Sequence, residues 1–310
     1  MIIEVNNLVK RYGELLALDH FNLQVQPGEI FGLLGPNGSG KTTAINCILS
    51  LLKYDKGDIR VFGKPMRPDS YDLKRDIGVV MQNVAVFKEL TVTENIDYFC
   101  GLYVPDNAQR SKLVEEAIVF TGLEDFRKFL PKKLSGGLLR RLNIACGIAH
   151  KPKLIILDEP TVAVDPQSRN NILEGIQRLN REGATVIYTS HYMEEVDQIC
   201  TRIAIMDKGK VIALGTSAEL KAMVSSGEKI TVELLRAEGA LAALAGSLEG
   251  IVSADVRTNE LVVRCAAGRN CLQGLMDLLQ TNNVPYGRIY CEPPTLNDVF
   301  LEITGKELRD

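Results

Sequence analysis

The stretch Gly-Pro-Asn-Gly-Ser-Gly-Lys-Thr-Thr at residues 35–43 carries the clearest chemical signal in this sequence. Glycines let successive backbone N–H groups turn inward and surround phosphate oxygens, and a following helix N-terminus adds partial positive charge. Lys41 can reach the β- and γ-phosphates of a nucleotide, and the Thr42 hydroxyl can bind magnesium. The predicted phosphate-binding residues are Gly35, Pro36, Asn37, Gly38, Ser39, Gly40, Lys41, Thr42 and Thr43.

The residues on either side of this stretch fit a phosphate-binding loop. Residues 30–34 form an apolar run typical of a buried strand, and apolar side chains recur at helical spacing over residues 42–53. Strand, glycine-rich loop and helix follow one another in the order that nucleotide binding requires. The alternative is an ordinary glycine turn that matches the phosphate-loop pattern by accident. From average residue usage, the chance of such a match in a chain of this length is roughly one in a hundred.

Two adjacent carboxylates follow a second apolar strand. Residues 154–157 read Leu-Ile-Ile-Leu, and Asp158 and Glu159 come next. Buried acids are costly unless they hold a metal or activate water, and ligands bind at the carboxyl ends of strands in α/β sheets. We therefore expect Asp158 to organise magnesium and Glu159 to polarise the attacking water.

Two more polar residues directly follow predicted strands, Gln82 and His191. Gln82 could bind magnesium through its amide oxygen or hold the attacking water, whereas a lone glutamine is more often a solvated loop residue. His191 could hydrogen-bond a γ-phosphate, whereas a lone histidine is more often structural. We interpret Glu194, Glu195 and Asp197 as the solvated face of the next helix.

Two other segments could contact a nucleotide. Ser135, Gly136 and Gly137 precede an amphipathic helix predicted over residues 138–149 and could bind a second anion at its start. The alternative is a plain helix cap with a flexible turn. Tyr12 could stack on an adenine ring, but local sequence alone favours a half-buried surface tyrosine.

Composition restricts the class of protein. The 310 residues are 45% hydrophobic, and the net charge of −3 argues against nucleic acid as the main partner. The seven cysteines show no Cys-x-x-Cys spacing and, without a signal peptide, are expected to be reduced thiols in the cytosol. No apolar run approaches the ~20 residues that span a bilayer, so a membrane role would require a partner.

The order of predicted elements indicates two domains. Residues 1–225 are predicted to form an α/β nucleotide-binding domain with antiparallel strands near its start and a helical subdomain at about 83–150. Residues 226–310 read β-α-β-β-α-β followed by a last helix, the order of a small α+β ferredoxin-like domain. We find no catalytic constellation in this second part.

Together these motifs resemble the ATP-binding subunit of an ATP-binding-cassette (ABC) transporter, over about residues 1–215. Under this resemblance the aromatic stacker is Tyr12, the Walker A loop is residues 35–43, the Q-loop residue is Gln82 and the signature is residues 134–137. The Walker B strand is residues 154–158, the catalytic carboxylate is Glu159, the D-loop aspartate is Asp165 and the switch histidine is His191. The tail at residues 294–305 resembles the branch that exports drugs, antibiotics and sodium.

The resemblance implies a P-loop NTPase fold: an ABC cassette with a mixed sheet, an antiparallel β subdomain and a helical subdomain. It implies a bacterial ATPase that binds ATP and Mg²⁺ and lies peripherally on the cytoplasmic side of the membrane. The partners would be an integral-membrane permease and a second copy of itself or a related ATPase subunit, with no nucleic acid expected.

The implied mechanism is a head-to-tail dimer in which the loop of one chain faces Ser135–Gly137 of the other. Lys41 and magnesium would neutralise the γ-phosphate, Glu159 would direct water and His191 would sense the γ-phosphate. The magnesium ligands would be Thr42, Gln82 and Asp158. The apolar residues Val84, Val86, Phe87 and Leu90 are candidates for receiving a helix of the permease, or else pack within the helical subdomain.

The sequence departs from the family pattern at two places. Leu138 replaces the glutamine that usually follows the signature, and residues 162–165 read Val-Ala-Val-Asp rather than Ser-Gly-Leu-Asp. Neither change removes a phosphate contact. The rival classes are a non-transport ABC ATPase of translation or DNA repair, which would predict tandem cassettes, long coiled coils or basic surfaces, and an inactive cassette, against which Glu159 and His191 argue.

Overall fold

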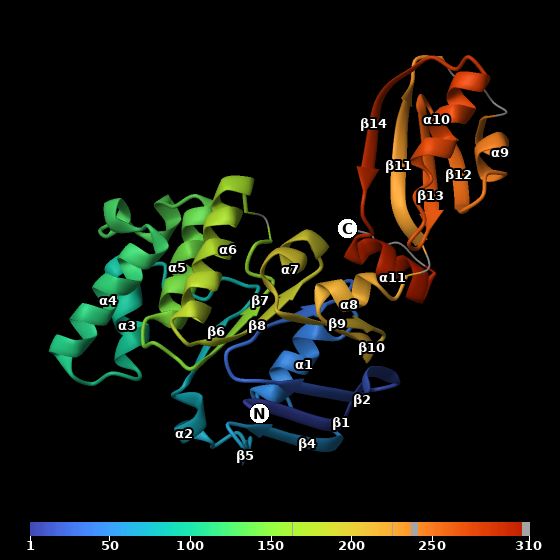
Figure 1. The fold of residues 1–310 in the computed structure, drawn as a ribbon. Helices are drawn as coiled ribbons and strands as arrows, with labels where there is room; N and C mark the ends of the chain where they lie inside the picture. The colour runs from blue at the N-terminus through green and yellow to red at the C-terminus, as the bar shows by residue number, and fades with distance from the viewer. Residues whose placement is uncertain (163, 225, 237–240, 306–310) are drawn as a thin grey trace. The chain divides into compact units, whose positions relative to one another are not determined.

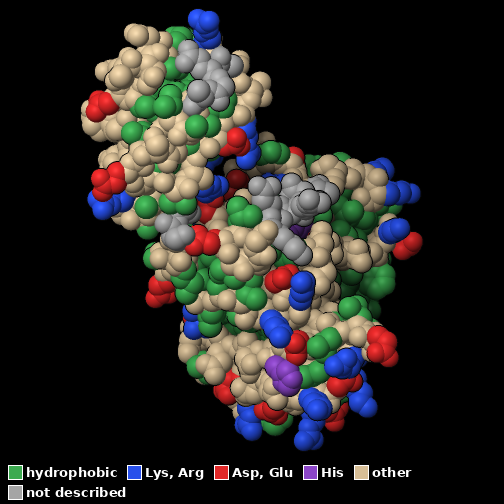
Figure 2. Space-filling view, turned by 90° about the vertical axis from the view of Figure 1, so that its right-hand side faces the viewer, with side chains coloured by type: hydrophobic (Ala, Val, Ile, Leu, Met, Phe, Trp, Pro, Cys, Tyr) green, Lys and Arg blue, Asp and Glu red, His purple; other side chains and the backbone are tan. Residues whose placement is uncertain are grey.

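The computed structural model describes residues 1–162, 164–224, 226–236 and 241–305 (Figure 1). The chain divides into two compact units, Met1–Ser217 and a second unit that begins at Ala218. Within the described residues, no helix is long and apolar enough to cross a membrane. Basic and acidic side chains are interspersed over the face drawn in Figure 2. This mixture is consistent with the small net charge of −3.

The first unit opens with a four-stranded antiparallel sheet in the order β2-β1-β4-β5. Apolar residues give β1, β2 and β4 one buried face, on which Ile3, Phe21 and Ile59 are fully or almost fully buried. This face packs with α1 into the same core as the central sheet, so α1 lies between the two sheets. The strands are β1 (Ile3–Tyr12), β2 (Leu15–Val25), β4 (Lys56–Val61) and β5 (Lys64–Pro65).

The central sheet has six strands in the order β10-β9-β3-β8-β7-β6. Its strands are parallel except for β10, which pairs antiparallel with β9. Helices cover both faces, which explains the nearly continuous apolar runs in β3, β7 and β8. The strands are β3 (Ile30–Leu34), β6 (Ile77–Val80), β7 (Leu154–Asp158), β8 (Thr185–Ser190), β9 (Arg202–Asp207) and β10 (Lys210–Gly215), and the accompanying helices are α1 (Lys41–Ile48), α2 (Tyr71–Lys74), α6 (Pro166–Arg181) and α7 (Met193–Ile199).

A helical region lies between β6 and β7 in the sequence and packs beside them (Figure 1). Its helices have defined starts: Thr91 and Glu94 form a capping box, Asp106 caps the next helix, and Ser135 caps the third. A separate apolar core that includes Ile96 and Ile118 holds it together. Its elements are α3 (Val92–Gly101), α4 (Asn107–Thr121), the short helices η1 (Glu124–Phe126) and η2 (Pro131–Lys133), and α5 (Gly136–Ile148).

The second unit is an antiparallel sheet of four strands in the order β12-β13-β11-β14. Its own apolar core includes Val232, Val263 and Leu275. The elements are α8 (Ser217–Lys221), β11 (Ser226–Leu234), α9 (Leu241–Gly246), β12 (Ile251–Arg257), β13 (Glu260–Ala266), α10 (Leu272–Thr281), β14 (Tyr286–Glu292) and α11 (Leu296–Thr304). No predicted site residue falls in this unit.

Candidate active site

The 35–43 loop connects β3 to α1, and its glycines are required by its geometry. Gly38 and Gly40 have φ of 81° and 106°, in the left-handed region that favours glycine. A Cβ on Gly40 would meet the carbonyl oxygen of Ala17 at 2.7 Å, and one on Gly35 would meet that of Met206 at 2.5 Å. Substitution at either position would therefore displace backbone on which the loop rests.

Lys41 points back into this loop. Its Nζ donates to the carbonyl oxygens of Gly35 at 2.7 Å and Pro36 at 3.2 Å, and lies 3.3 Å from Oε1 of Glu159. The residue is only 5% exposed. Burial lowers the pKa of Lys41, and the opposite charge of Glu159 counteracts that effect. The structure thus holds an ammonium group inside the glycine-rich loop, beside a carboxylate.

Asp158 is the last residue of β7, and its side chain links this strand to α1 and to β8. Its Oδ2 accepts from the Thr42 hydroxyl at 2.8 Å, and its Oδ1 accepts from the Thr189 hydroxyl at 2.6 Å. The side chain is fully buried. A carboxylate beside a hydroxyl on a helix N-terminus is a set of hard oxygen ligands, which suits Mg²⁺.

Glu159 lies next to Asp158 in a left-handed backbone conformation, with φ of 47°. Its N–H donates to the hydroxyl and carbonyl oxygens of Thr189, at 3.0 and 3.2 Å. Its carboxylate accepts from Nε2 of Gln82 at 3.2 Å, and Nδ1 of His191 lies 3.3 Å from Oε1 without forming a well-oriented hydrogen bond. A non-glycine residue held in this region is backbone strain of the kind found at functional sites.

Among the described residues, hydrogen bonds and polar contacts of at most 3.3 Å, in part through Thr189, therefore join six predicted site residues: Lys41, Thr42, Gln82, Asp158, Glu159 and His191. Two predicted contacts lie outside this network. Tyr12 is 48% exposed, with the Lys10 ammonium 5.1 Å from its ring centre. Ser135 caps α5 through the N–H of Leu138.

The turn at Ser135–Gly137 packs beside the start of α6. A Cβ on Gly137 would meet Oγ of Ser168 at 2.8 Å, and Asp165 caps α6 through the N–H of Ser168. Ala163, which belongs to the predicted D-loop, lies outside the described residues. The predicted signature and D-loop are therefore neighbours in one chain.

Ser39 supplies an independent sign that the loop is shaped for an anion. Its hydroxyl oxygen is buried and has no hydrogen-bond partner in the part of the chain that the structure describes. A buried hydroxyl without a partner costs free energy, and a phosphate oxygen would accept from it. The residues present thus fit a nucleotide phosphate, and the Thr42–Asp158 pair fits its magnesium.

The interpretation of Glu195 as solvated was wrong. Glu195 is 3% exposed, and its Oε2 accepts from the hydroxyls of Tyr188 (2.7 Å), Thr161 (2.8 Å) and Ser190 (3.0 Å). Ser190 also accepts from the N–H of Tyr192, so Glu195 helps fix the turn around His191. One signal was available: Glu195 lies four residues before the apolar Ile199, on the same helix face.

Glu194 is exposed, as predicted, whereas Asp197 is half-buried and accepts from the Ser217 hydroxyl.

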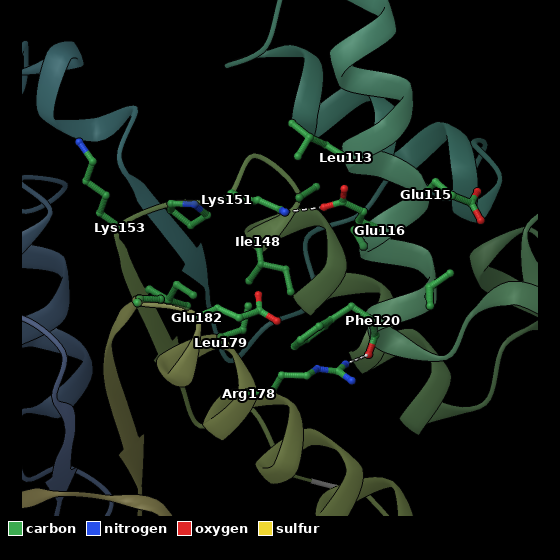
Figure 3. A pocket seen from close by; sticks show the side chains of 17 residues that line it. Leu113, Glu115, Glu116, Phe120, Ile148, Lys151, Lys153, Arg178, Leu179 and Glu182 are labelled. Carbon is green, nitrogen blue, oxygen red and sulfur yellow. Dashed lines mark hydrogen bonds and ion pairs between the residues drawn. The ribbon is translucent and has the colours of Figure 1, made fainter.

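A cavity of about 650 Å³ lies away from the loop, between α4, the end of α5 and the end of α6 (Figure 3). Arg178 borders it and donates to the carbonyl oxygen of Phe120 at 2.9 Å. None of the predicted site residues lines this cavity. The candidate active site is therefore the polar cluster at the carboxyl ends of β3, β6, β7 and β8.

This fold and this cluster define a nucleotide-hydrolysing P-loop protein, and comparison with known proteins identifies the family. The family model described as ABC transporter matches residues 18–162. The chain belongs to this family: it is an ATP-binding subunit with ATPase activity, from the exporter branch. These findings confirm the resemblance seen in the sequence and the ABC cassette fold with its mixed sheet.

Among its relatives is the linearmycin resistance ATP-binding protein LnrL of Bacillus subtilis (strain 168), 36% identical over 311 residues, or 100% of each chain. The Nod factor export ATP-binding protein I of Sinorhizobium fredii (strain NBRC 101917 / NGR234) is 32% identical over 99% of this chain and 87% of its own. A solved dimeric ATP-binding cassette, MJ0796 in a post-hydrolysis state with ADP and Pi, is 28% identical, with a TM-score of 0.64 over 69% of this chain and 98% of its own.

Proposed function

We propose that this chain hydrolyses ATP to power export through a separate integral-membrane permease, from a peripheral position on the cytoplasmic side of the membrane. The observation that carries the proposal is the cluster of Lys41, Asp158, Glu159, Gln82 and His191 around a glycine-rich loop. The relatives named for resistance and export support an exported substrate.

Each side chain of the cluster has a task in this proposal. Lys41 and the N–H groups of the loop bind the phosphates, and the buried ammonium offsets negative charge that develops in the transition state. Glu159 accepts a hydrogen bond from the attacking water and orients it. His191, 3.3 Å from Glu159, contacts the γ-phosphate from the end of β8.

Magnesium would be held by Thr42, Asp158 and Gln82 and would supply positive charge at the β- and γ-phosphates. Asp158 is buried and accepts a hydrogen bond from the Thr42 hydroxyl. When magnesium binds, this hydrogen bond would be lost, and the Thr42 hydroxyl and the Asp158 carboxylate would each bind the ion. Gln82 presents its amide at the same edge, where Nε2 donates to Glu159.

We propose a head-to-tail dimer in which Ser135–Gly137 of one chain completes the site of the other. In this chain that turn lies outside the polar cluster, with the start of α5 as a further anion-binding terminus. The dimeric state of the solved cassette MJ0796 supports this arrangement. Tyr12, exposed on β1, would stack on the adenine.

The permease would dock beside the segment that follows Gln82. Val84 and Phe87 are exposed, and Phe87 packs against Tyr98 and Phe99 with ring centroids 4.8 and 5.8 Å apart. Val86 instead packs against the helical core. It is therefore better placed to hold this segment on the helical subdomain than to contact the permease. This segment leads from a nucleotide contact to an exposed aromatic surface, so it can transmit nucleotide state.

The second unit would be a ferredoxin-like accessory domain, beginning near residue 226, that regulates the dimer or stabilises it. Its strand order β12-β13-β11-β14 and its two helices between strands support this assignment.

Membrane association tests the export part of the proposal. Phe87→Glu should prevent the chain from sedimenting with membranes that contain its permease, while ATP hydrolysis in solution persists. Val119→Glu, at an exposed valine on α4, is the matched control and should sediment normally. A Phe87→Glu variant that stays folded and sediments like wild type would place the docking surface elsewhere.

A further inference from the structure

Arg140 is a buried charge on α5 with a distinctive set of contacts. It is 4% exposed, and burial lowers the pKa of its guanidinium, an effect that the nearby Asp158 charge opposes. Among the described residues no carboxylate forms an ion pair with it. A buried cation of this kind must be stabilised by hydrogen bonds.

All the N–H donors of the Arg140 guanidinium are used, and every acceptor is a backbone carbonyl at the edge of the sheet. The acceptors are the carbonyl oxygens of Pro160 (2.7 Å), Gln82 (2.8 Å), Glu159 (2.8 Å), Met81 (2.9 Å) and Asp158 (3.2 Å). One planar side chain therefore fastens the segment after β6 to the segment after β7. These two segments carry Gln82 and Glu159.

The rest of α5 packs on β6 and on the segment that follows it. Asn143, one turn further along, accepts from the N–H of Ala85 at 3.1 Å. Gly147 packs directly on β6, since a Cβ there would meet Cγ2 of Val80 at 2.7 Å, and a Cβ on Gly78 would overlap the carbonyl oxygen of Gly147. Helix α5 is therefore packed on β6, and Arg140 links it to the end of β7.

We propose that Arg140 is a positioning residue that holds the backbone of Gln82 and Glu159 in register with each other and with α5. Because α5 begins at the Ser135–Gly137 turn, a displacement of that turn would carry both side chains with it. The inference rests on the proposed function, in which Gln82 and Glu159 act on magnesium and water. Lysine cannot replace arginine here, since an ammonium has three donors and no planar fork.

The test compares Arg140→Lys and Arg140→Met with Arg141→Lys in the full chain. Arg141 is the matched control, because it is the next residue of α5 and its Nη1 donates at 3.3 Å to carbonyls of Thr121 and Gly122, away from the site. Steady-state ATP hydrolysis is measured per nucleotide-binding site, together with the Kd for ATP. For Arg140→Lys we expect kcat to fall about tenfold or more, because small misplacements of reacting groups are costly.

The Kd for ATP should stay within about threefold in Arg140→Lys, since none of the five guanidinium hydrogen bonds goes to the 35–43 loop. Arg140→Met should lose more activity, and Arg141→Lys should match wild type. Equal kcat in Arg140→Lys and Arg141→Lys would overturn the inference. Loss of ATP binding in both Arg140 variants would also overturn it, because it would show a role in folding rather than in positioning.

A double-mutant cycle with Gln82→Ala separates this inference from the proposed function. If Arg140 acts through Gln82 and Glu159, the loss of kcat in the double variant will be smaller than the product of the single losses. Losses that multiply in full would contradict the positioning role. Normal turnover in Glu159→Gln would instead refute the proposed function itself, whatever the Arg140 variants do.

Discussion

Replacing Glu195 with alanine gives a sharp test of how the turn around His191 is held. The substitution removes an acceptor shared by the buried hydroxyls of Thr161, Tyr188 and Ser190, of which only Thr161 and Tyr188 lie within hydrogen-bond distance of each other, at 3.3 Å. It also removes the carboxylate 3.2 Å from Nε of Arg169. Arg169 is 31% exposed and can be solvated, so the main cost is that of buried hydroxyls left without their acceptor, about 1–3 kcal/mol each.

That cost can be measured by calorimetry of the full chain. For a unit of this size, 1 kcal/mol corresponds to roughly 2–4 °C in Tm, so Glu195→Ala should lower the transition of the first unit by about 10 °C. Glu195→Gln retains the volume and one acceptor oxygen, so its shift should be smaller. ATP hydrolysis should also fall, because Ser190 would no longer anchor the 190–192 turn.

Glu194→Ala is the control, since Glu194 is the exposed neighbour on the same helix, and surface substitutions stay within about 0.5 kcal/mol. If Glu195→Ala and Glu194→Ala shift the transition equally, the hydroxyl cluster does not stabilise this part of the structure. The argument from its burial would then be refuted.

Three further outcomes follow from the same structure. Ser135→Arg should leave ATP binding intact but block the ATP-dependent dimer, and a dimer of normal stability in sedimentation would contradict the shared site. A chain cut before residue 228 should still bind ATP, because the residues that follow supply no member of the polar cluster, and loss of ATP binding in a folded truncated chain would disprove this. Burial raises the pKa of Cys47 and of Cys100 to about 11, so the folded state keeps protons that unfolded thiols release above about pH 8.5. The free energy of unfolding should therefore fall as pH rises through about 9 and 10, and an unchanged Tm over that range would contradict the burial of these thiols.

Much of the site could be predicted because its chemistry is local in sequence. The glycines and Lys41 lie within nine residues, and Asp158 and Glu159 are adjacent at the end of an apolar strand. Parallel strands then bring Gln82 and His191 to the same edge of the sheet. Residue type and position relative to a strand were sufficient for these.

The remaining contacts depend on packing that no local pattern encodes. Glu195 and Arg140 are charged residues on helices, and charged helical residues are usually solvated. Their burial follows from where α7 meets β8 and where α5 meets β6, which sequence spacing does not reveal. Helix starts were also displaced: α5 was predicted from residue 138 but begins at Gly136, because Ser135 provides the cap.

The sequence predicts a division of the chain at residue 225, and the two compact units of the structure divide between Ser217 and Ala218. Helix α8 groups with the second unit, and its short polar sequence gave no sign of this. The accessory role of that unit stays a prediction.

The most direct test of the proposed mechanism is steady-state hydrolysis of ATP by Glu159→Gln with magnesium present, with ATP binding measured in the same sample. The substituted glutamine would have nearly the same shape as Glu159 but could no longer accept a proton from water or attract its hydrogen bond as strongly. We expect turnover to fall by about a hundredfold or more while ATP still binds and the dimer accumulates. Turnover at the wild-type rate would contradict the assignment of Glu159 and, with it, the proposed mechanism.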